Sequence, residues 1–141
     1  MMTQLEQNKA IALRFAKEGW GTNSNWQKIW DEVVATDIIW HHCALLAPLQ
    51  GIEAAKKFNG SLFFGFPDMQ QSIETMIAED TGVAMRHTLT GTHAGSFLGI
   101  PPTGKQVTGT GVRFFRIAAG KIIETWYEIN LLGFMQQIGL K

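Results

Sequence analysis

Two histidines and the single cysteine of the chain stand side by side, as His41, His42 and Cys43. Adjacent side chains of an extended segment point to opposite faces, so these neighbours cannot easily share one metal ion. No HExxH pattern or other spaced ligand set completes a metal centre, and no family signature surrounds Cys43 as a nucleophile. We therefore expect no metal site. One histidine should face the interior and the other the solvent.

A more promising imidazole belongs to His87, in a stretch whose residues alternate between two faces. In the predicted strand Val83–His93, the large apolar side chains Val83, Met85 and Leu89 lie on the same face as His87 and define it as the covered one. A histidine there is either a hydrogen-bonded core residue or an acid, base or donor in a pocket. Both interpretations stay open.

Arg113 and Tyr127 are the other candidates on predicted strands. An arginine on a concave face must be paired or must meet a ligand, and otherwise Arg113 faces solvent. Alternation does not decide this, because each face of Lys105–Ile117 carries one Arg and one Phe. Tyr127 is the only tyrosine and lies among apolar neighbours. It is either a core aromatic residue or a phenol donor that polarises a carbonyl group.

Helical patterns dominate the first 65 residues, and strand patterns dominate the rest. A capping box formed by Thr3 and Glu6 begins a helix that ends at Gly19, and Asn25 can cap a second helix. A third helix is expected to start after Gly51 and to run to about Phe64, following an extended piece at Asp37–Cys43. The predicted strands are Gln70–Ala78, Val83–His93, Lys105–Ile117 and Lys121–Leu131, with a loop at Gly95–Gly104 and a short apolar tail at Leu132–Ile138. This order predicts an α+β fold with helices on one face of an antiparallel sheet.

The last predicted strand assigns its side chains to two faces of the sheet. One face, expected to be covered, carries Ile123, Thr125, Tyr127 and Ile129. The open face of the sheet should combine Trp126, Phe114 and Val112 with the threonines Thr88, Thr90 and Thr110. Apolar surface of this kind marks an association face, so we expect a homodimer formed through it.

Composition excludes several classes of function. The 141 residues predict one domain, and 45% hydrophobic with 17% charged residues is not the composition of a disordered chain. The 12 basic and 12 acidic residues balance, so the charge gives no support for binding nucleic acid or a membrane surface. The polar start lacks the pattern of a signal peptide, and no apolar run approaches the roughly 18 residues of a membrane span. The expected location is cytoplasmic.

The stretch Arg86–Gly95, continued by Phe97–Gly104, carries most of the block THAGSFLGIPPTGK, which ends at Lys105. It strongly resembles the SnoaL-like polyketide cyclase (ester cyclase) family. The resemblance extends over nearly the whole chain, through Phe114–Ile122, Trp126 and Leu131–Gly133, and upstream through Asn8–Phe15, Trp20, Asp37–His41, Gly51–Phe58 and Phe66–Asp68.

This resemblance implies one domain over residues 1–141, with the cone-shaped α+β fold of nuclear transport factor two and ketosteroid isomerase. A strongly bent antiparallel sheet wraps around three N-terminal helices and encloses an apolar pocket. The characterised cyclases close a ring by an intramolecular aldol step, without metal or cofactor. An acidic side chain on the last strand is their general acid and base.

The chain departs from the family at this acidic residue. The matching position holds Tyr127, and a second position that is often acidic in relatives holds Asn130. A phenol with a pKa near 10 is a poor base at neutral pH, which leaves His87 as the candidate base. We expect His87 and Tyr127 to be catalytic. The residues expected to bind the ligand are Arg113, Trp40, His41, Phe15, Trp20 and Phe115.

Three functions therefore remain for a pocket that takes a small carbonyl-bearing or aromatic molecule. The first is a cyclase- or isomerase-type proton transfer without a cofactor. The second is non-catalytic binding of the same kind of molecule, favoured by the missing carboxylate. The third is epoxide hydrolysis, which needs an Asp-Arg-Asp group to activate water, whereas the four predicted sheet strands contain no Asp.

Overall fold

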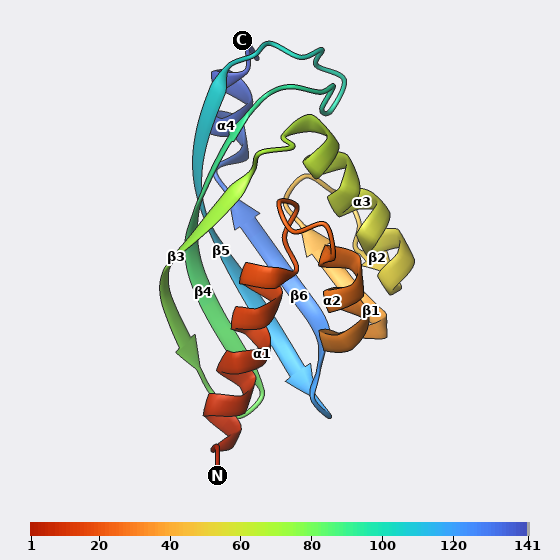
Figure 1. The fold of residues 1–141 in the computed structure, drawn as a ribbon, viewed down its shortest axis with the longest axis vertical. Coiled ribbons are helices and arrows are strands. Elements are labelled where there is room, and N and C mark those ends of the chain that lie inside the picture. The colour runs from red at the N-terminus through yellow and green to blue at the C-terminus, as the bar shows by residue number, and fades with distance from the viewer. Residues whose placement is uncertain (141) are drawn as a thin grey trace.

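The computed structural model describes residues 1–140, which form four helices and six strands. The helices are α1 (Gln4–Glu18), α2 (Trp26–Val33), α3 (Ile52–Gly65) and α4 (Leu131–Gln137). The strands are β1 (Val34–His42), β2 (Leu49–Gln50), β3 (Gln70–Ala78), β4 (Gly82–Thr92), β5 (Gln106–Ala118) and β6 (Lys121–Ile129). Figure 1 shows α1, α2 and α3 in front of one bent sheet, with α4 beside its upper end. The α+β fold predicted from the sequence is confirmed.

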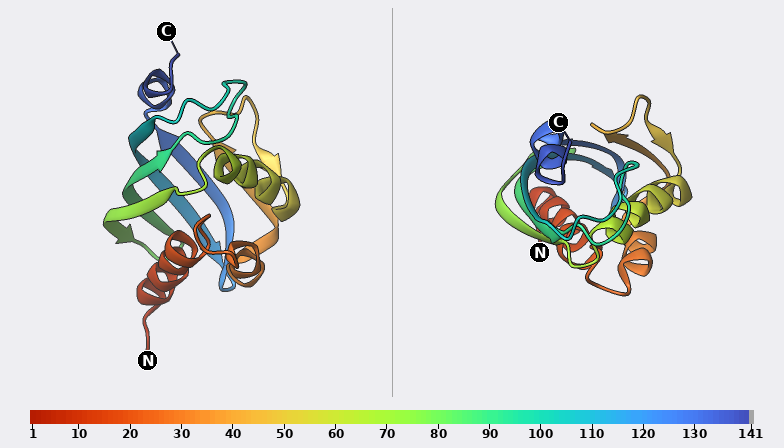
Figure 2. Two further views of the ribbon diagram at one scale, coloured as in Figure 1. Left: turned by 45° about the horizontal axis from the view of Figure 1, so that its top comes forward. Right: turned by 90° about the horizontal axis from the view of Figure 1, so that it is seen from above.

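The sheet has the order β2-β1-β6-β5-β4-β3 and is mixed, not purely antiparallel as expected. The segment from β3 to β6 is an antiparallel meander, but β1 runs parallel to β6, with Trp40 paired to Thr125 and His42 to Tyr127. A parallel pair requires a long connection, and the chain between β1 and β6 supplies one. The view from above in Figure 2 shows how far the sheet curls around the helices.

The first two helices begin where local sequence predicts and differ in how they are capped. Thr3 and Glu6 form the expected capping box of α1. Asn25 precedes α2 but makes no side-chain cap; instead its backbone N–H donates to Asn23. Because α2 ends at Val33, β1 starts three residues earlier than predicted.

A β-bulge changes which side chains of β6 face the helices. The register shifts between Arg116 and Ile117, so Ile122 is buried in the core and Ile123 is not, contrary to the expected alternation. Beyond the bulge, Thr125 and Tyr127 face inward as predicted. On β5 the burial pattern alternates strictly, which places Arg113 and Phe115 inside and leaves Phe114 outside.

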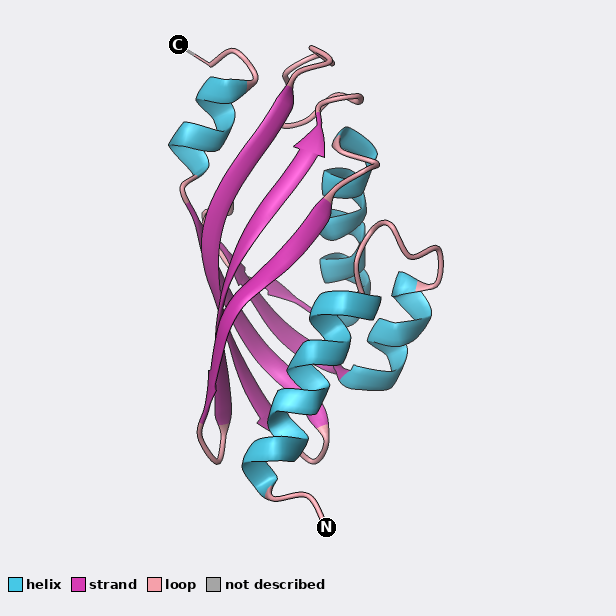
Figure 3. Ribbon diagram, turned by 60° about the vertical axis from the view of Figure 1, so that its left-hand side comes forward, coloured by secondary structure: helices cyan, strands magenta, loops and turns pink. Residues whose placement is uncertain are grey.

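The buried side chains form two clusters, one at each end of the cone. The first joins α1 and α2 to β1, β4, β5 and β6, and it includes Phe15, Trp30, Trp40 and Phe115. The second joins the end of α3, the loop after β4, and α4, and includes Tyr127. Within residues 1–140, no helix is long and apolar enough to cross a membrane. The opposite face of the sheet is bare apart from its end near α4 (Figure 3).

Candidate functional site

A row of inward side chains crosses four neighbouring strands where the sheet curves around the helices. Met85 on β4 pairs with Arg113 on β5, Arg113 pairs with Tyr127 on β6, and Tyr127 pairs with His42 on β1. His87 lies one inward position further along β4. The sheet register therefore brings together the three residues that sequence analysis selected from separate strands.

The ring of Tyr127 is the centre of this group. The guanidinium carbon of Arg113 lies 4.3 Å from the centre of the Tyr127 ring. The imidazole of His87 is stacked on the same residue, with ring centres 5.1 Å apart and planes 8° apart. The ring centre of His42 lies 4.9 Å from that of Tyr127. We call these four residues, His42, His87, Arg113 and Tyr127, the interior cluster.

Arg113 is almost completely buried, with 1% of its surface exposed. Its guanidinium carbon also lies 4.7 Å from the ring of Trp40 and 5.5 Å from that of Phe15. Its Nη1 donates to Thr125 Oγ1 at 3.2 Å, and that hydroxyl donates to the Phe114 carbonyl at 2.9 Å. Burial lowers the pKa of Arg113 to about 10, so the guanidinium stays charged at neutral pH.

His87 is fully buried and fits its place because Gly111 stands opposite it on β5. A Cβ added at Gly111 would lie 3.2 Å from both Cε1 and Nε2 of the imidazole. Burial, together with the charge of Arg113, lowers the pKa of His87 to about 4. The imidazole is therefore neutral at pH 7 and offers a free lone pair.

The phenol of Tyr127 is in the opposite situation. Burial raises its pKa, so the hydroxyl keeps its proton and can donate a hydrogen bond. Neither this hydroxyl, nor either ring nitrogen of His87, nor Nε of Arg113 has a hydrogen-bond partner within residues 1–140. Buried polar atoms are normally satisfied, so four such atoms in one cluster indicate a place for a ligand or solvent.

The histidine pair at the end of β1 divides as predicted, one inside and one outside, but His42 is the inward one. His41 lies on the outer face, where its ring stacks on Trp126 and Nε2 lies 2.8 Å from Glu124 Oε2. Its expected place in the ligand site is therefore not what the structure shows. His42 Nδ1 accepts a hydrogen bond from the Ala44 backbone at 3.0 Å. Burial and the charge of Arg113 lower its pKa to about 3.

Alternation could have identified His42. Trp40 was expected to bind the ligand inside the cone, and residues two apart on a strand share a face. Of the aromatic residues expected in the site, Trp40, Phe15 and Phe115 belong to the first core cluster, the first two in contact with Arg113. Trp20 lies in the second cluster, against Phe63 at 5.0 Å.

A small apolar cavity reaches the interior cluster from the α4 end of the cone. Tyr127 and His42 line it, together with Leu62, Leu89, Phe97, Ile129, Leu131 and Phe134. Its volume is about 20 Å³. Space of this size accommodates about one water molecule, whereas pockets for small molecules span roughly 300–1,000 Å³. Most of the lining is apolar, and side chains from α3, α4 and the loop after β4 occupy the surrounding space.

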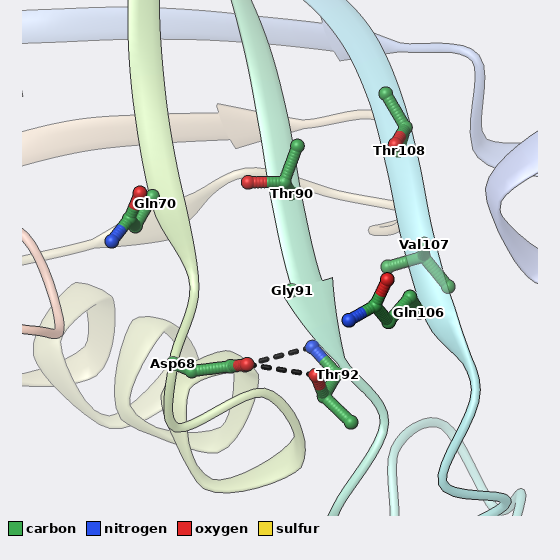
Figure 4. A pocket seen from close by; sticks show the side chains of 8 residues that line it. All are labelled: Asp68, Gln70, Thr90, Gly91, Thr92, Gln106, Val107 and Thr108. Carbon is green, nitrogen blue, oxygen red and sulfur yellow. Dashed lines mark hydrogen bonds between the residues drawn. The ribbon is translucent and has the colours of Figure 1, made fainter.

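A larger groove of about 370 Å³ lies elsewhere, near the ends of β3, β4 and β5 (Figure 4). Its walls are polar and include Asp68, Gln70, Thr90, Thr92, Gln106 and Thr108. Asp68 accepts from the backbone and the hydroxyl of Thr92, both at 2.7 Å, and these bonds lower its pKa. No residue of the interior cluster lines this groove, so its volume says nothing about the chemistry of the cone.

The interior contains no replacement for the missing carboxylate. Within residues 1–140, no Asp or Glu is among the buried side chains. Glu128 is exposed, and Asn130 caps α4, its Oδ1 accepting from the Gly133 backbone at 3.1 Å. In the same described part of the chain, no three His, Cys, Asp or Glu residues are grouped to hold a metal ion.

A bent mixed sheet that curls around helices defines a cone-shaped α+β fold, and sequence comparison gives the family of the chain. Residues 10–138 match the model of the SnoaL-like polyketide cyclase family, so the chain belongs to this family. A search of curated proteins found no match to the chain.

Solved structures agree with this assignment. A protein from Jannaschia sp. CCS1 named as a SnoaL-like polyketide cyclase is 33% identical, with a TM-score of 0.94, covering 100% of this chain and 97% of the other. AclR from Streptomyces galilaeus, named as a hydroxylase, is 26% identical, with a TM-score of 0.77 and coverage of 96% and 82%. A protein from Acidithiobacillus ferrooxidans named as a polyketide cyclase shares the fold, with 24% identity, a TM-score of 0.80 and 97% coverage of both chains.

Proposed function

We propose that this protein binds a small, largely apolar carbonyl compound inside the cone and catalyses proton transfer next to its carbonyl group without a cofactor. The observation that carries the proposal is the contact of one ring, that of Tyr127, with both His87 and Arg113. A neutral imidazole accepts a proton, while a phenol and a guanidinium donate hydrogen bonds to the oxygen that becomes negative. Membership of a family of cyclases, and a relative named as one, support the same chemistry.

In this mechanism the base and the oxyanion donors are separate groups. His87 removes a proton from the carbon beside the carbonyl, and the electron pair moves to the carbonyl oxygen. Tyr127 and Arg113 stabilise the resulting enolate by hydrogen bonding and by charge. The enolate carbon then forms a bond to a second carbonyl carbon of the same molecule. The imidazolium of His87 returns its proton to the new alkoxide, so the protein ends unchanged.

Substrate entry requires movement, because the cavity has room for only about one water molecule. Phe97 belongs to the loop between β4 and β5 and packs against Phe66 and Phe134, whose ring centres lie 5.3 and 6.3 Å from its own. Outward movement of this loop would join the cavity to solvent and expose Tyr127 and His42.

Non-catalytic binding is the second candidate, and one observation favours it. Burial makes His87 a weaker base than a free imidazole, and no carboxylate replaces it within the buried part of residues 1–140. A binder would use the same cone interior but would have no rate for a His87 variant to lose.

The test is α-proton exchange into D2O, followed by proton NMR on methyl 2-acetylbenzoate, an aromatic ketone that carries a methyl ester. The wild type should accelerate exchange, and His87→Ala should lose about a hundred- to ten-thousand-fold of the acceleration. His41→Ala, which changes a histidine on the outer face, is the matched control and should keep the full rate. Binding without exchange would favour the second candidate. Exchange that His87→Ala leaves unchanged would exclude His87 as the base.

A further inference from the structure

One lysine and one arginine are buried within residues 1–140, and only the lysine has a counter-charge. Lys56 is 8% exposed, and its Nζ lies 2.5 Å from Asp31 Oδ1 and 3.8 Å from Glu53 Oε1. Arg113 is 1% exposed, and none of the ion pairs within residues 1–140 includes it. The fold therefore neutralises one buried cation and leaves the other uncompensated.

The surroundings of Arg113 compensate its charge only in part. Aromatic faces of Tyr127, Trp40 and Phe15 attract the cation, but they accept no hydrogen bonds in the plane of the guanidinium. That plane carries five N–H donors, of which Nη1 reaches Thr125 and Nε has no acceptor within the described residues. A buried charge that lacks an opposite charge is strongly unfavourable, so the arrangement is suited to a partner that arrives from outside.

We propose that Arg113 is the binding site for an anionic oxygen, a carboxylate or comparable oxyanion, carried by a flat apolar ligand. This inference rests on the interior site of the proposed function. It adds that the ligand carries a negative charge. The planar guanidinium matches a carboxylate through two parallel hydrogen bonds, and the aromatic rings around it fit a flat molecule.

The cavity provides the direction of approach. It ends on Tyr127, and the face of the same ring carries the guanidinium at 4.3 Å. A ligand that enters past Phe97 meets Tyr127 first and reaches Arg113 by displacing this one ring. The hydroxyl of Tyr127, which has no partner within residues 1–140, stays available to donate to the carbonyl oxygen of the same ligand.

A bound anion would also change the neighbouring base. The positive charge of Arg113 contributes to the lowered pKa of His87. Neutralising that charge raises the pKa of His87 toward its ordinary value, where an imidazole is a more effective base at neutral pH. Recognition of the anion and activation of His87 are thereby coupled through Arg113.

The test measures binding by isothermal titration calorimetry at pH 7, with 2-naphthoate and its neutral methyl ester as probes. Wild-type protein should bind the carboxylate at least tenfold more tightly than the ester. Arg113→Met should bind the two probes equally. Arg116→Met is the matched control, because this neighbouring arginine lies half-exposed on the outer face, and it should keep the preference. No preference in the wild type, no binding of either probe, or a preference retained by Arg113→Met would each overturn the proposal.

A measurement on the wild type alone covers the case in which Arg113→Met does not fold. The ring signals of His87, followed by NMR during a pH titration, should show a higher pKa with 2-naphthoate bound than with the methyl ester. An unchanged pKa would contradict the proposal. The two proposals can fail separately. Selectivity for 2-naphthoate without α-proton exchange would support the anion site and contradict the proposed catalysis. Exchange without this selectivity would support the catalysis and contradict the anion site.

Discussion

The imidazole of His87 is stacked nearly parallel on the phenol ring of Tyr127, with ring centres 5.1 Å apart and planes 8° apart. Stacking uses the faces of the two rings and leaves the polar atoms at their edges unbonded within residues 1–140. A core pair selected only for stability would normally satisfy these atoms. The stack holds a proton acceptor and a proton donor in fixed positions, which is the property required of a catalytic pair.

Protonation of His87 should make stability depend on pH. Its pKa is about 4 in the folded protein and near 6.5 in the unfolded chain. Between these values the unfolded chain binds the extra proton, so the free energy of unfolding rises with pH. The contribution is complete above about pH 6.5 and is lost as the pH falls toward about 4; at pH 5 the loss is about 2 kcal/mol.

Urea denaturation between about pH 4.5 and 7.5 measures this effect. His87→Gln should reduce the pH dependence of the free energy of unfolding, because it removes the imidazole whose pKa is lowered by burial. His42, whose pKa is lowered to about 3, should add a slope of the same sign. A His87→Gln variant with the wild-type slope would show that the buried imidazole is not held neutral.

Gly111→Ala should disturb the site more than the size of a methyl group suggests. The added Cβ would lie 3.2 Å from the imidazole of His87 and 2.6 Å from the Glu128 carbonyl oxygen, so backbone or ring must shift. We expect a loss of about 1–3 kcal/mol in the free energy of unfolding, together with reduced α-proton exchange.

The control for this substitution is Gly60→Ala in α3. A Cβ there would lie 3.9 Å from the Trp26 ring, an ordinary contact. Alanine inside a helix is favoured over glycine by up to about 1 kcal/mol, so this variant should be as stable as the wild type or more so. Equal effects of the two substitutions would show that Gly111 has no special relation to His87.

Arg113→Met should cost little stability in the protein without ligand. The substitution loses the aromatic contacts and the Thr125 hydrogen bond, but it also removes a buried charge that has no counter-charge within residues 1–140. Replacing buried ions by apolar side chains of similar volume is often neutral or stabilising. We expect thermal unfolding within a few degrees of the wild type. A loss of more than about 3 kcal/mol would assign Arg113 a structural role.

The open face of the sheet should form a homodimer. Phe114 and Val112 are 40% and 46% exposed there, beside Trp126, whose ring is stacked on His41. Burying this apolar patch against a second copy removes it from water. Sedimentation at micromolar concentration should show a dimer for the wild type and a monomer for Val112→Glu. Leu46→Glu, a fully exposed leucine outside the sheet, is the control. A monomeric wild type would contradict the prediction.

Local sequence predicted most helices and strands, because caps and hydrophobic periodicity depend on residues that are close in the sequence. Alternating residues defined β3 with the observed bounds, and β4 and β5 were displaced by one residue at each end. The parallel orientation of β1 relative to β6 was not predicted, because the pairing of distant strands depends on the whole chain. The bulge that buries Ile122 in place of Ile123 was also not predicted, because it arises from the register of β5 against β6.

Alternation predicted that His87 and Tyr127 face inward, but His41 was assigned to the site and His42 was not, and the packing around them was not predicted. In the structure these two rings, of His87 and Tyr127, stack directly on each other, and Arg113 lies against the ring of Tyr127. Alternation could not show that Phe97 and Phe134 fill the space beside Tyr127, because the packing of a loop and a terminal helix has no periodic signal. The pKa of His87 also depends on burial and on a charge from another strand.

The most direct test of the account is the pH dependence of α-proton exchange in the wild type and in His87→Ala. Methyl 2-acetylbenzoate is neutral and leaves the charge of Arg113 in place, so His87 should remain unprotonated down to its pKa of about 4. The account predicts a wild-type rate that is constant from about pH 8 to about pH 5.5 and about a hundred- to ten-thousand-fold lower in His87→Ala. A rate that halves near pH 6.5, or one that His87→Ala leaves intact, would contradict it.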